Sequence, residues 1–264
     1  MGLLEGKKAL IFGVANDHSI AWGIAKALHE QGAAVGFSSI EEVLERRVKP
    51  LAESIGSTFV EPCDVQNDAE IAVVFEKWEA HYGTLDILVH SLAFAGRDAL
   101  SGQFVNTTRD QFQLALDISA YSLVALTRAA LPVLHPGSNV LAMTYYASEK
   151  WVPNYNVMAI AKSALESCAR YLAVELGPQG IRVNCISAGP IRTLAASGVA
   201  GFRTMHNKFK DVAPLRRNLN IEDVGNAAIW LCSDLASATT GEVLFVDGGV
   251  NVLAIAAPDE DSAE

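Results

Sequence analysis

Residues 8–25, KALIFGVANDHSIAWGIA, form the segment that decides the fold. The apolar run at 8–14 predicts a buried strand, Gly13 predicts a tight turn, and the spacing at 20–31 predicts a helix. A strand, a glycine turn and a helix in this order bring backbone N–H groups and the positive end of a helix to one point, where a pyrophosphate can bind. The turn lacks the G-x-G-x-x-G pattern, since its second glycine, Gly23, lies within the helix, where we expect it to allow close packing on the sheet.

Ser19 stands where the N-cap of this helix is expected. From that position its hydroxyl can cap the helix and also donate to a phosphate, and capping alone is the alternative interpretation. Gly13 can likewise be interpreted in two ways, as part of a phosphate site or as a residue that only forms the turn. The segment by itself therefore predicts a dinucleotide site without deciding the role of either residue.

Short apolar runs alternate with stretches of helical length along the rest of the chain. Seven strands are predicted, at 8–14, 33–38, 58–65, 86–93, 138–146, 181–187 and 242–249. Helices are predicted between most of them, at 20–31, 67–82, 109–135, 155–176 and 221–234. This alternation, with strands apolar on both faces, predicts an α/β fold: a single Rossmann-like, doubly wound, seven-stranded parallel sheet with helices on both faces.

A single sheet domain of this class can occupy a chain of 264 residues. We expect one dinucleotide-binding domain over residues 1–257. Two connections are longer than such units need, 94–108 after the fourth strand and 188–217 after the sixth, and both follow the carboxyl end of a strand, where open α/β sheets bind ligands. They are candidate substrate loops. The polar, acidic residues 258–264 are predicted to form a mobile tail.

Composition narrows the classes of function. The formal net charge of −10 would repel a phosphate backbone, so we predict no nucleic-acid partner. The cysteines show no C-x-x-C pair and no histidine at metal spacing, so we predict neither a metal nor a disulfide framework; they are Cys63, Cys168, Cys185 and Cys232. No apolar run reaches the roughly 18 residues of a membrane span, and the start shows no signal-peptide pattern, so we predict no membrane partner and a cytoplasmic protein.

Two further strand ends favour a dinucleotide. CDV at 63–65 ends the third predicted strand, and the Asp64 carboxylate can accept a hydrogen bond from an adenine amino group; the alternative is an aspartate that caps the next helix. HSLA at 90–93 ends the fourth strand with small residues where the backbone can approach a ribose, and tight packing is the alternative.

SSIEEVLERR at 38–47 bears on the choice of cofactor. Glu41 and Glu42 come before any arginine, and their negative charge disfavours the additional phosphate of NADP. Ser19 and Arg46 count against this preference. We predict NAD as the cofactor.

The stretch YYASEKWVPNYNVMAIAK at 145–162 contains two candidate catalytic pairs. One is Tyr146 with Lys150, and the other is Tyr155 with Lys162. A working pair needs the lysine ammonium beside the cofactor ribose and the tyrosine hydroxyl beside the reacting carbonyl. A helix is the usual way to hold both in place.

Pro153 bars a helix that continues from Tyr146, so the first pair lies on a strand end and a loop. Tyr155 and Lys162 begin a proline-free stretch in which seven steps of about 100° return the lysine to almost the same face, about 10 Å along the axis. A chance spacing is the alternative. The position directly after the fifth predicted strand favours Tyr155 and Lys162.

The sequence resembles the enoyl-acyl-carrier-protein reductases of bacterial fatty acid synthesis, a divergent branch of the short-chain dehydrogenase/reductases. The resemblance covers nearly the whole chain. Its motifs are GVANDHSIAWGIA, CDV, HSLAFA, PNYNVM, ISAGPIRTLAASG, IEDVG, GEVLFVDGG and the array Tyr145-x9-Tyr155-x6-Lys162. Ordinary short-chain reductases pair Tyr and Lys as Y-x3-K on the helix. Tyr146 and Lys150 have this spacing but do not lie on the helix, so we interpret them as a decoy, a pair that matches the pattern without being catalytic. Ile40 is a departure, because NADH-using members carry a polar residue there, near the adenosine ribose.

The resemblance implies a set of site residues by position. Cofactor contacts are implied for Gly13, Ser19, Ile20, Asp64, Val65, Ser91, Leu92, Lys162 and the run Ile191, Arg192, Thr193, Leu194 and Ala195. The substrate side is implied for Ala95, Tyr145, Tyr155, Phe202 and Met205. Ordinary apolar packing is the alternative for the last two. The implied catalytic residues are Tyr145, Tyr155 and Lys162.

The implied reaction is the NADH-dependent reduction of a trans-2-enoyl thioester of acyl carrier protein, with hydride delivered to the β-carbon. Tyr155 would stabilise the enolate oxygen, Lys162 would hold the ribose hydroxyls, and Tyr145 would line the acyl site. One alternative is a β-ketoacyl reductase of the same fold, which would need a helical Y-x3-K and a nearby serine. Another is a non-catalytic dinucleotide-binding protein. The resemblance also implies a homotetramer.

Residues 203–217 are basic in an otherwise acidic protein. The basic residues are Arg203, Lys208, Lys210, Arg216 and Arg217, opposed only by Asp211. Carrier proteins are strongly negative, so docking requires a local reversal of charge. We expect Arg203, Lys208 and Lys210 to receive the carrier protein. The alternatives are a solvated helical face and, for Arg216 and Arg217, internal ion pairs.

Overall fold

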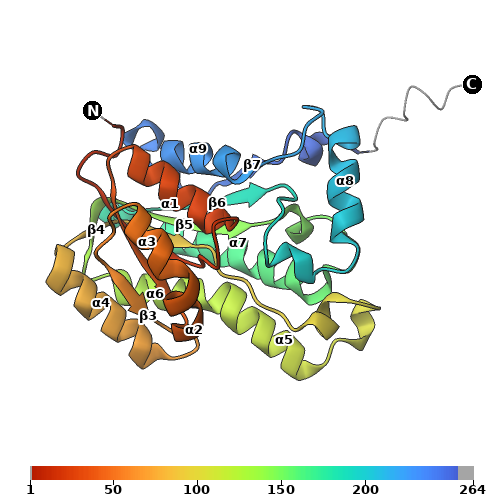
Figure 1. The fold of residues 1–264 in the computed structure, drawn as a ribbon, viewed down its shortest axis with the longest axis horizontal. Helices are drawn as coiled ribbons and strands as arrows, with labels where there is room; N and C mark the ends of the chain where they lie inside the picture. Colours follow the sequence, from red (N-terminus) through yellow and green to blue (C-terminus); the bar gives the residue numbers. More distant parts are fainter. Residues whose placement is uncertain (1, 255–264) are drawn as a thin grey trace, which may run out of the picture.

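The structure, a computed structural model, describes residues 2–254 and is built on one sheet of seven parallel strands. The strands are β1 (Lys8–Phe12), β2 (Ala34–Ser39), β3 (Val60–Pro62), β4 (Leu85–His90), β5 (Leu134–Thr144), β6 (Arg182–Ala188) and β7 (Val243–Val246). Their order is β3-β2-β1-β4-β5-β6-β7 (Figure 1). The first three strands are added towards one side of the sheet, and β4 to β7 are added towards the other side. This topology confirms the predicted doubly wound sheet.

Helices cover both faces of the sheet (Figure 1). They are α1 (Ile20–Glu30), α2 (Glu41–Val43), α3 (Lys49–Ser54), α4 (Asp68–Tyr82), α5 (Arg109–Leu116), α6 (Ser122–Ala130), α7 (Asn156–Leu176), α8 (Phe202–Val212) and α9 (Ile221–Cys232). Residues of α1, α3 and α9 share one buried apolar cluster, whereas residues of α4, α6 and α7 share the other. The sheet therefore separates two cores.

The alternation of side chains along β1 produces these two cores. Ala9 and Ile11 belong to the cluster under α1, whereas Leu10 and Phe12 belong to the cluster under α4. All four are at most 1% exposed. Because successive strand residues point to opposite faces, a run of apolar residues is what a sheet covered on both sides requires.

Two glycines set the contact between α1 and α9, which lie side by side in Figure 1. A Cβ atom on Gly23 would lie 2.6 Å from Cβ of Ile221, and one on Gly225 would lie 2.7 Å from the carbonyl oxygen of Gly23. The expectation that Gly23 packs on the sheet is therefore wrong. Its missing side chain allows two helices to approach each other on the outside of the sheet.

The structure also corrects several predicted boundaries. The predicted helix at 109–135 is two helices, α5 and α6, joined by a π-helical turn at Asp117–Tyr121. Its predicted end is wrong, because Leu134 already pairs with Leu85 of β4. Residues 41–54 are mostly helical although no helix was predicted there, and the second candidate loop contains α8. The predicted tail at 258–264 and the end of the predicted domain lie outside the described residues.

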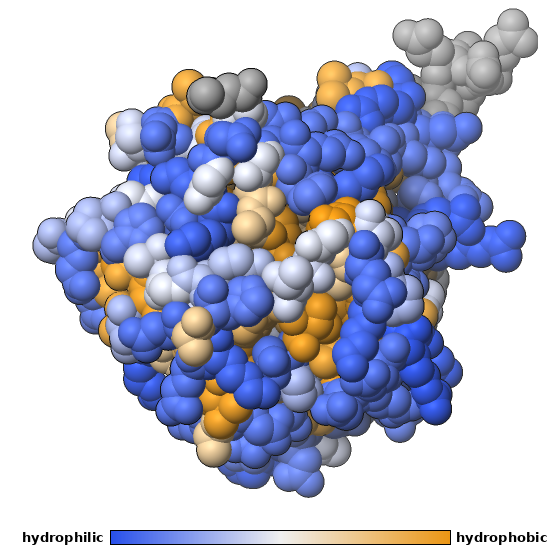
Figure 2. Space-filling view, turned by 60° about the vertical axis from the view of Figure 1, so that its left-hand side comes forward, coloured by the Kyte–Doolittle hydropathy of each residue, from blue (hydrophilic) through white to orange (hydrophobic). Residues whose placement is uncertain are grey.

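The face shown in Figure 2 is mainly hydrophilic, with apolar side chains gathered in patches near its middle. Large apolar side chains that remain exposed include Trp151, Tyr171 and Val174. Within residues 2–254, no helix combines the length and the apolar character that a membrane crossing requires.

Candidate active site

The residues that follow β1, β4, β5 and β6 meet at one edge of the sheet. Phe12 pairs with His90, and Thr144 pairs with Ser187, so the carboxyl ends of these parallel strands lie side by side. Both long connections, 94–108 and 188–217, begin at this edge. The edge thus brings together most of the predicted site residues from distant parts of the sequence.

Gly13 shows that the turn after β1 is built for close backbone approach. Its φ of 104° lies in the left-handed region, and a Cβ atom there would lie 2.1 Å from the carbonyl oxygen of Ser91. The Ser91 N–H donates to the Phe12 carbonyl at 3.0 Å. A side chain at position 13 would break this junction, and the contact of this turn with a phosphate stays a prediction.

Ser19 lies at the N-cap position of α1, but its hydroxyl does not cap the helix. The oxygen accepts the N–H groups of Ala15 and Asn16, both at 3.0 Å, and the hydroxyl donates to Asn16 Oδ1 at 3.2 Å. Capping by the Ser19 side chain is therefore a wrong prediction, because the hydroxyl closes the preceding turn instead. Its contact with a phosphate stays a prediction.

Asp64 follows β3 and is exposed. Its carboxylate accepts the Gln66 N–H at 3.0 Å. The N-cap of α4 is Asn67, whose side chain accepts the N–H groups of Ala69 and Glu70. The alternative that Asp64 caps the next helix is therefore wrong, and the adenine contact stays a prediction.

The segment after β2 carries the charges that bear on cofactor choice. Glu41 and Glu42 lie in the first turn of the short helix α2 and are exposed. Arg46 pairs with Glu42 at 3.5 Å. Because Glu42 neutralises Arg46, this arginine is a weak candidate for a phosphate contact.

The rings of Tyr145 and Tyr155 form a T-shaped pair at the carboxyl ends of the strands. Their ring centroids are 5.0 Å apart with an interplanar angle of 65°. Tyr145 follows β5, and Tyr155 is the residue just before α7. Burial raises the pKa of Tyr145 to about 12 and raises the pKa of Tyr155 above its ordinary value. Both hydroxyls therefore keep their protons at neutral pH and can donate hydrogen bonds.

Lys162 lies two turns along α7 and is only 5% exposed. Its Nζ donates to the Met143 carbonyl of β5 at 2.7 Å. Burial lowers the pKa of Lys162 to about 8, although the nearby Cys185 and Glu166 partly oppose this shift. At neutral pH the side chain is still largely protonated and places a positive charge beside the end of β5.

Two buried polar pairs lie near Lys162, and sequence reasoning missed both. Thr144 Oγ1 donates to Glu166 Oε1 at 2.6 Å, and Glu166 lies one helical turn beyond Lys162. His90 Nε2 and Ser122 Oγ are 2.7 Å apart, and burial, with a smaller effect of Lys162, lowers the pKa of His90 to about 3. The signal for Glu166 was its position four residues after Lys162 on a largely apolar helix face.

The structure does not bring Tyr146 and Lys150 into the site. The Tyr146 hydroxyl donates to the Asn251 carbonyl at 3.1 Å, and its ring packs edge-on against Phe245. Lys150 is exposed on the loop before α7. Tyr146 therefore anchors the chain after β7, and the interpretation of this pair as a decoy stays a prediction.

Both long connections contribute to the apolar cluster against which Tyr155 packs. Leu100 of the first connection forms the cluster with Met158 and Ala161 of α7, and Val199 of the second connection packs against it, as does Ala95. On α8, Met205 Sδ lies 3.8 Å from the Tyr145 hydroxyl. Phe202, one turn earlier, is half-buried and stacks on His206. The structure thus brings Met205 to Tyr145, and Ala95 and Tyr155 to one cluster, whereas the contact that it gives Phe202 is with His206.

The run from Ile191 to Ala195 has mixed surroundings. Ile191 is buried in the core under α1. Thr193 Oγ1 accepts the Ala196 N–H at 3.1 Å and so closes the turn before α8. Leu194 is 48% exposed. The cofactor contacts predicted for this run stay predictions, and Ile191 also has a packing role.

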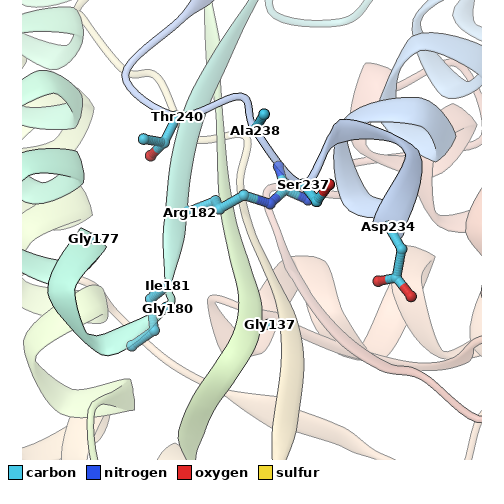
Figure 3. Close-up of a pocket in the computed structure, with 9 residues that line it drawn as sticks. All are labelled: Gly137, Gly177, Gly180, Ile181, Arg182, Asp234, Ser237, Ala238 and Thr240. Carbon is cyan, nitrogen blue, oxygen red and sulfur yellow. The ribbon is translucent and has the colours of Figure 1, made fainter.

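A hollow of about 270 Å³ lies at the opposite edge of the sheet, near the start of β6 (Figure 3). Arg182 projects towards it, but its guanidinium donates to the backbone carbonyls of Leu231, Ser233 and Thr239 at 2.7 to 3.1 Å. These bonds tie the end of α9 to β6. The hollow is therefore distinct from the tyrosine site and is lined by a structural arginine.

Comparisons with known proteins agree with this geometry. A protein-family model described as Enoyl-(Acyl carrier protein) reductase matches residues 13–251. The sequence is 49% identical to the enoyl-acyl-carrier-protein reductase (NADH) 1 of Rhizobium meliloti, over 98% of this chain and 96% of that protein. The enoyl-acyl carrier protein reductase of Bacillus cereus, solved with NADP+ and indole naphthyridinone, has a TM-score of 0.94 at 48% identity, covering 97% of this chain and 100% of that chain. The reductase of Anaplasma phagocytophilum, solved in complex with NAD, has a TM-score of 0.93 at 46% identity, covering 97% and 98%.

Proposed function

The chain belongs to the enoyl-acyl-carrier-protein reductase family, and we propose that it reduces trans-2-enoyl thioesters of acyl carrier protein to saturated thioesters with NADH, in fatty acid biosynthesis. One observation carries the proposal. Tyr155, just before α7, and Lys162, two turns within it, lie with Tyr145 at the same sheet edge as the turn at Gly13.

The residues at this edge fit a dinucleotide. The close approach of Gly13 to Ser91 supports a pyrophosphate at the amino end of α1, where Ser19 and Ile20 stand. The carboxylates of Glu41 and Glu42 favour a cofactor without a 2′-phosphate. The contacts carried over by position are Gly13, Ser19, Ile20, Asp64, Val65, Ser91, Leu92, Lys162 and Ile191 to Ala195. NADH bound there supplies the hydride that is added to the β-carbon.

Tyr155 serves as the donor to the thioester oxygen. When hydride reaches the β-carbon, negative charge develops on this oxygen as the substrate becomes an enolate. The Tyr155 hydroxyl is protonated at neutral pH, and burial raises its pKa further, so it can then donate a hydrogen bond that is stronger in the transition state than in the ground state. An oriented donor of this kind is worth about 10² to 10³ in rate. Tyr145, whose ring packs on that of Tyr155, lines the acyl site.

Lys162 holds the cofactor ribose. A lysine ammonium has three donors, and the Met143 carbonyl takes one of them. The other two remain for ribose hydroxyls. The contact with Met143 also directs the side chain towards the end of β5.

Turnover of crotonyl thioester with NADH, followed at the nicotinamide absorbance, tests the reaction. A β-ketoacyl reductase would instead oxidise the cofactor with a β-ketoacyl thioester, and a non-catalytic binding protein would bind NADH without oxidising it. The surroundings of Tyr146 argue against the first alternative, because its hydroxyl is engaged with the chain after β7.

Carrier-protein docking is assigned to α8. Arg203, Lys208 and Lys210 are exposed on this helix, which also places Met205 against Tyr145. The other two basic residues are engaged elsewhere. Arg217 makes a bidentate pair with Asp223, at 2.7 Å for both bonds, and Arg216 donates to the Asp211 carbonyl. These contacts support three of the five basic residues as the docking surface.

Replacement of Arg203, Lys208 and Lys210 by alanine tests this docking surface. KM for an enoyl-carrier-protein substrate should rise and its salt dependence should flatten, because the attraction to an acidic partner is lost. Turnover of an uncharged N-acetylcysteamine enoyl thioester should change little. Equal losses with both substrates would place the docking surface elsewhere.

Three broader assignments remain proposals: a single domain, a homotetramer and a cytoplasmic location. Tyr171 and Val174 are 72% and 78% exposed on the outer side of α7, which supports a subunit interface there. Light scattering of the purified protein tests the tetramer. The free thiols, three of them buried, suit a reducing compartment.

A further inference from the structure

Tyr155 is flanked by two residues with unusual backbone angles. Asn154 has a φ of 61° and Asn156 a φ of 40°, in the left-handed region that favours glycine. Within residues 2–254, Arg216 is the only other non-glycine residue with positive φ. Asparagine tolerates this region better than most residues do. Unusual backbone angles on both sides of one residue nevertheless persist only where the surrounding structure holds them.

The side chains of these asparagines reach different substrate loops. Asn154 Nδ2 donates to the Ala200 carbonyl at 2.9 Å, in the connection 188–217. Asn156 Nδ2 donates to the Ser101 carbonyl at 3.2 Å, in the connection 94–108. Each residue next to Tyr155 is thus hydrogen-bonded to a different loop: Asn154 to the connection 188–217 and Asn156 to the connection 94–108.

A left-handed glycine follows each accepting carbonyl. Gly201, after Ala200, has a φ of 80°, and Gly102, after Ser101, has a φ of 68°. These turns direct the two carbonyls towards the segment that contains Tyr155. A Cβ atom on Gly201 would lie 3.8 Å from Asn154 Nδ2, which shows how closely this loop passes the amide.

The same two loops share an apolar cluster with the Tyr155 ring. Leu100 of one loop forms this cluster with Met158 and Ala161, and Tyr155, Ala95 and, from the other loop, Val199 pack against it. Each loop is therefore linked to Tyr155 in two ways, through this cluster and through a hydrogen bond to a neighbouring asparagine. A shift of either loop changes both contacts together.

We propose that Asn154 and Asn156 are positioning residues that orient the Tyr155 hydroxyl by tying its backbone between the two substrate loops. The proposal rests on the proposed reductase function. The phenol oxygen lies at the end of the tyrosine side chain. A small rotation of the Tyr155 backbone therefore displaces this oxygen more than it displaces the backbone itself. A misplacement of about 1 Å can cost about 10² in rate. Closure of the loops over an acyl chain would thereby also set the direction of the catalytic donor.

Aspartate substitutions separate the tether from the backbone conformation. Asp tolerates positive φ much as Asn does and has nearly the same shape, but its carboxylate cannot donate to a carbonyl. We expect Asn154→Asp and Asn156→Asp each to lower kcat for crotonyl thioester about tenfold or more, with an unchanged Kd for NADH. Asn226→Asp, the same change at an exposed position on α9, is the matched control and should leave kcat unchanged.

A double-mutant cycle with Tyr155→Phe distinguishes positioning from a general loss of structure. If the asparagines act through the Tyr155 hydroxyl, Asn156→Asp should lower kcat less than about threefold when that hydroxyl is absent. Asn154→Asp should behave in the same way. An equal loss in the wild-type background and in the Tyr155→Phe background would overturn the proposal.

Hydrogen exchange measures the tethers without relying on activity. Asn154→Asp should raise amide exchange at residues 196–202, and Asn156→Asp should raise it at 97–106. Exchange that is unchanged, or that rises throughout the protein, would overturn the proposal. If the wild-type enzyme failed to reduce the thioester, the proposed function would be wrong, and the exchange patterns would still decide whether the tethers exist.

Discussion

Replacement of Tyr155 by phenylalanine removes the proposed oxyanion donor and little else. The phenylalanine ring can keep the contact with Tyr145, with centroids 5.0 Å apart, and the packing against the cluster that contains Leu100. No hydrogen bond to another described residue holds the Tyr155 hydroxyl, so its removal leaves no partner unsatisfied within residues 2–254. We therefore expect the variant to fold with nearly unchanged stability.

The magnitude follows from the surroundings of the hydroxyl. A donor to an oxyanion in a site shielded from water contributes about 10² to 10³ in rate. Tyr155 is mostly but not fully buried, so in the variant a water molecule can replace part of this contribution. We expect kcat to fall by roughly 10- to 10³-fold, which corresponds to about 1.4 to 4 kcal/mol of transition-state stabilisation.

Steady-state kinetics with crotonyl thioester and NADH measure this loss. The Kd for NADH, from fluorescence titration, should stay within about twofold, because Lys162 and not Tyr155 is assigned to the ribose. Tyr146→Phe is the matched control. It loses the hydrogen bond to the Asn251 carbonyl, so it should lower stability by about 1 kcal/mol but change kcat little. A larger loss of kcat in Tyr146→Phe than in Tyr155→Phe would refute the assignment.

Three further predictions concern the cofactor and the packing of α1. NADH should bind more weakly as pH rises through about 8, because the burial-lowered pKa of Lys162 means that its ammonium loses its proton there, and Lys162→Met should bind weakly without this transition in a fluorescence titration. NADH should have a higher kcat/KM than NADPH, because Glu41 and Glu42 repel a 2′-phosphate; equal values would contradict this reasoning. Gly23→Ala should lower the free energy of unfolding in urea by about 1 to 3 kcal/mol, since the new Cβ would lie 2.6 Å from Cβ of Ile221, and an unchanged value would argue against this close contact.

The strands were predictable because their signal is local. All seven apolar runs overlap a strand, and the predicted helices at 20–31 and 155–176 differ from α1 and α7 by one residue each. The start of β5 was not predictable in this way. Leu134 is extended because it pairs with Leu85, almost fifty residues away, and no local pattern contains that pairing.

The sequence indicated which residues belong to the candidate site better than it indicated their hydrogen-bond partners. Pro153 and the proline-free stretch after it favoured Tyr155 over Tyr146, and both are local features. The Ser19 hydroxyl was expected to cap α1, but it accepts N–H groups of the preceding turn. A hydroxyl oxygen has several possible partners within one turn, and only the path of the chain decides among them.

By itself, the sequence determined the doubly wound sheet, and it predicted a candidate site at the carboxyl edge with Tyr155 and Lys162 as its pair, because periodicity, proline and glycine act over a few residues. Only the tertiary structure decided that Gly23 faces α9, that Glu166 accepts a hydrogen bond from Thr144, and that Asn154 and Asn156 tie Tyr155 to two loops. These contacts join segments far apart in the chain, or depend on which way a side chain turns. They exist only once the sheet has brought those segments to a common edge.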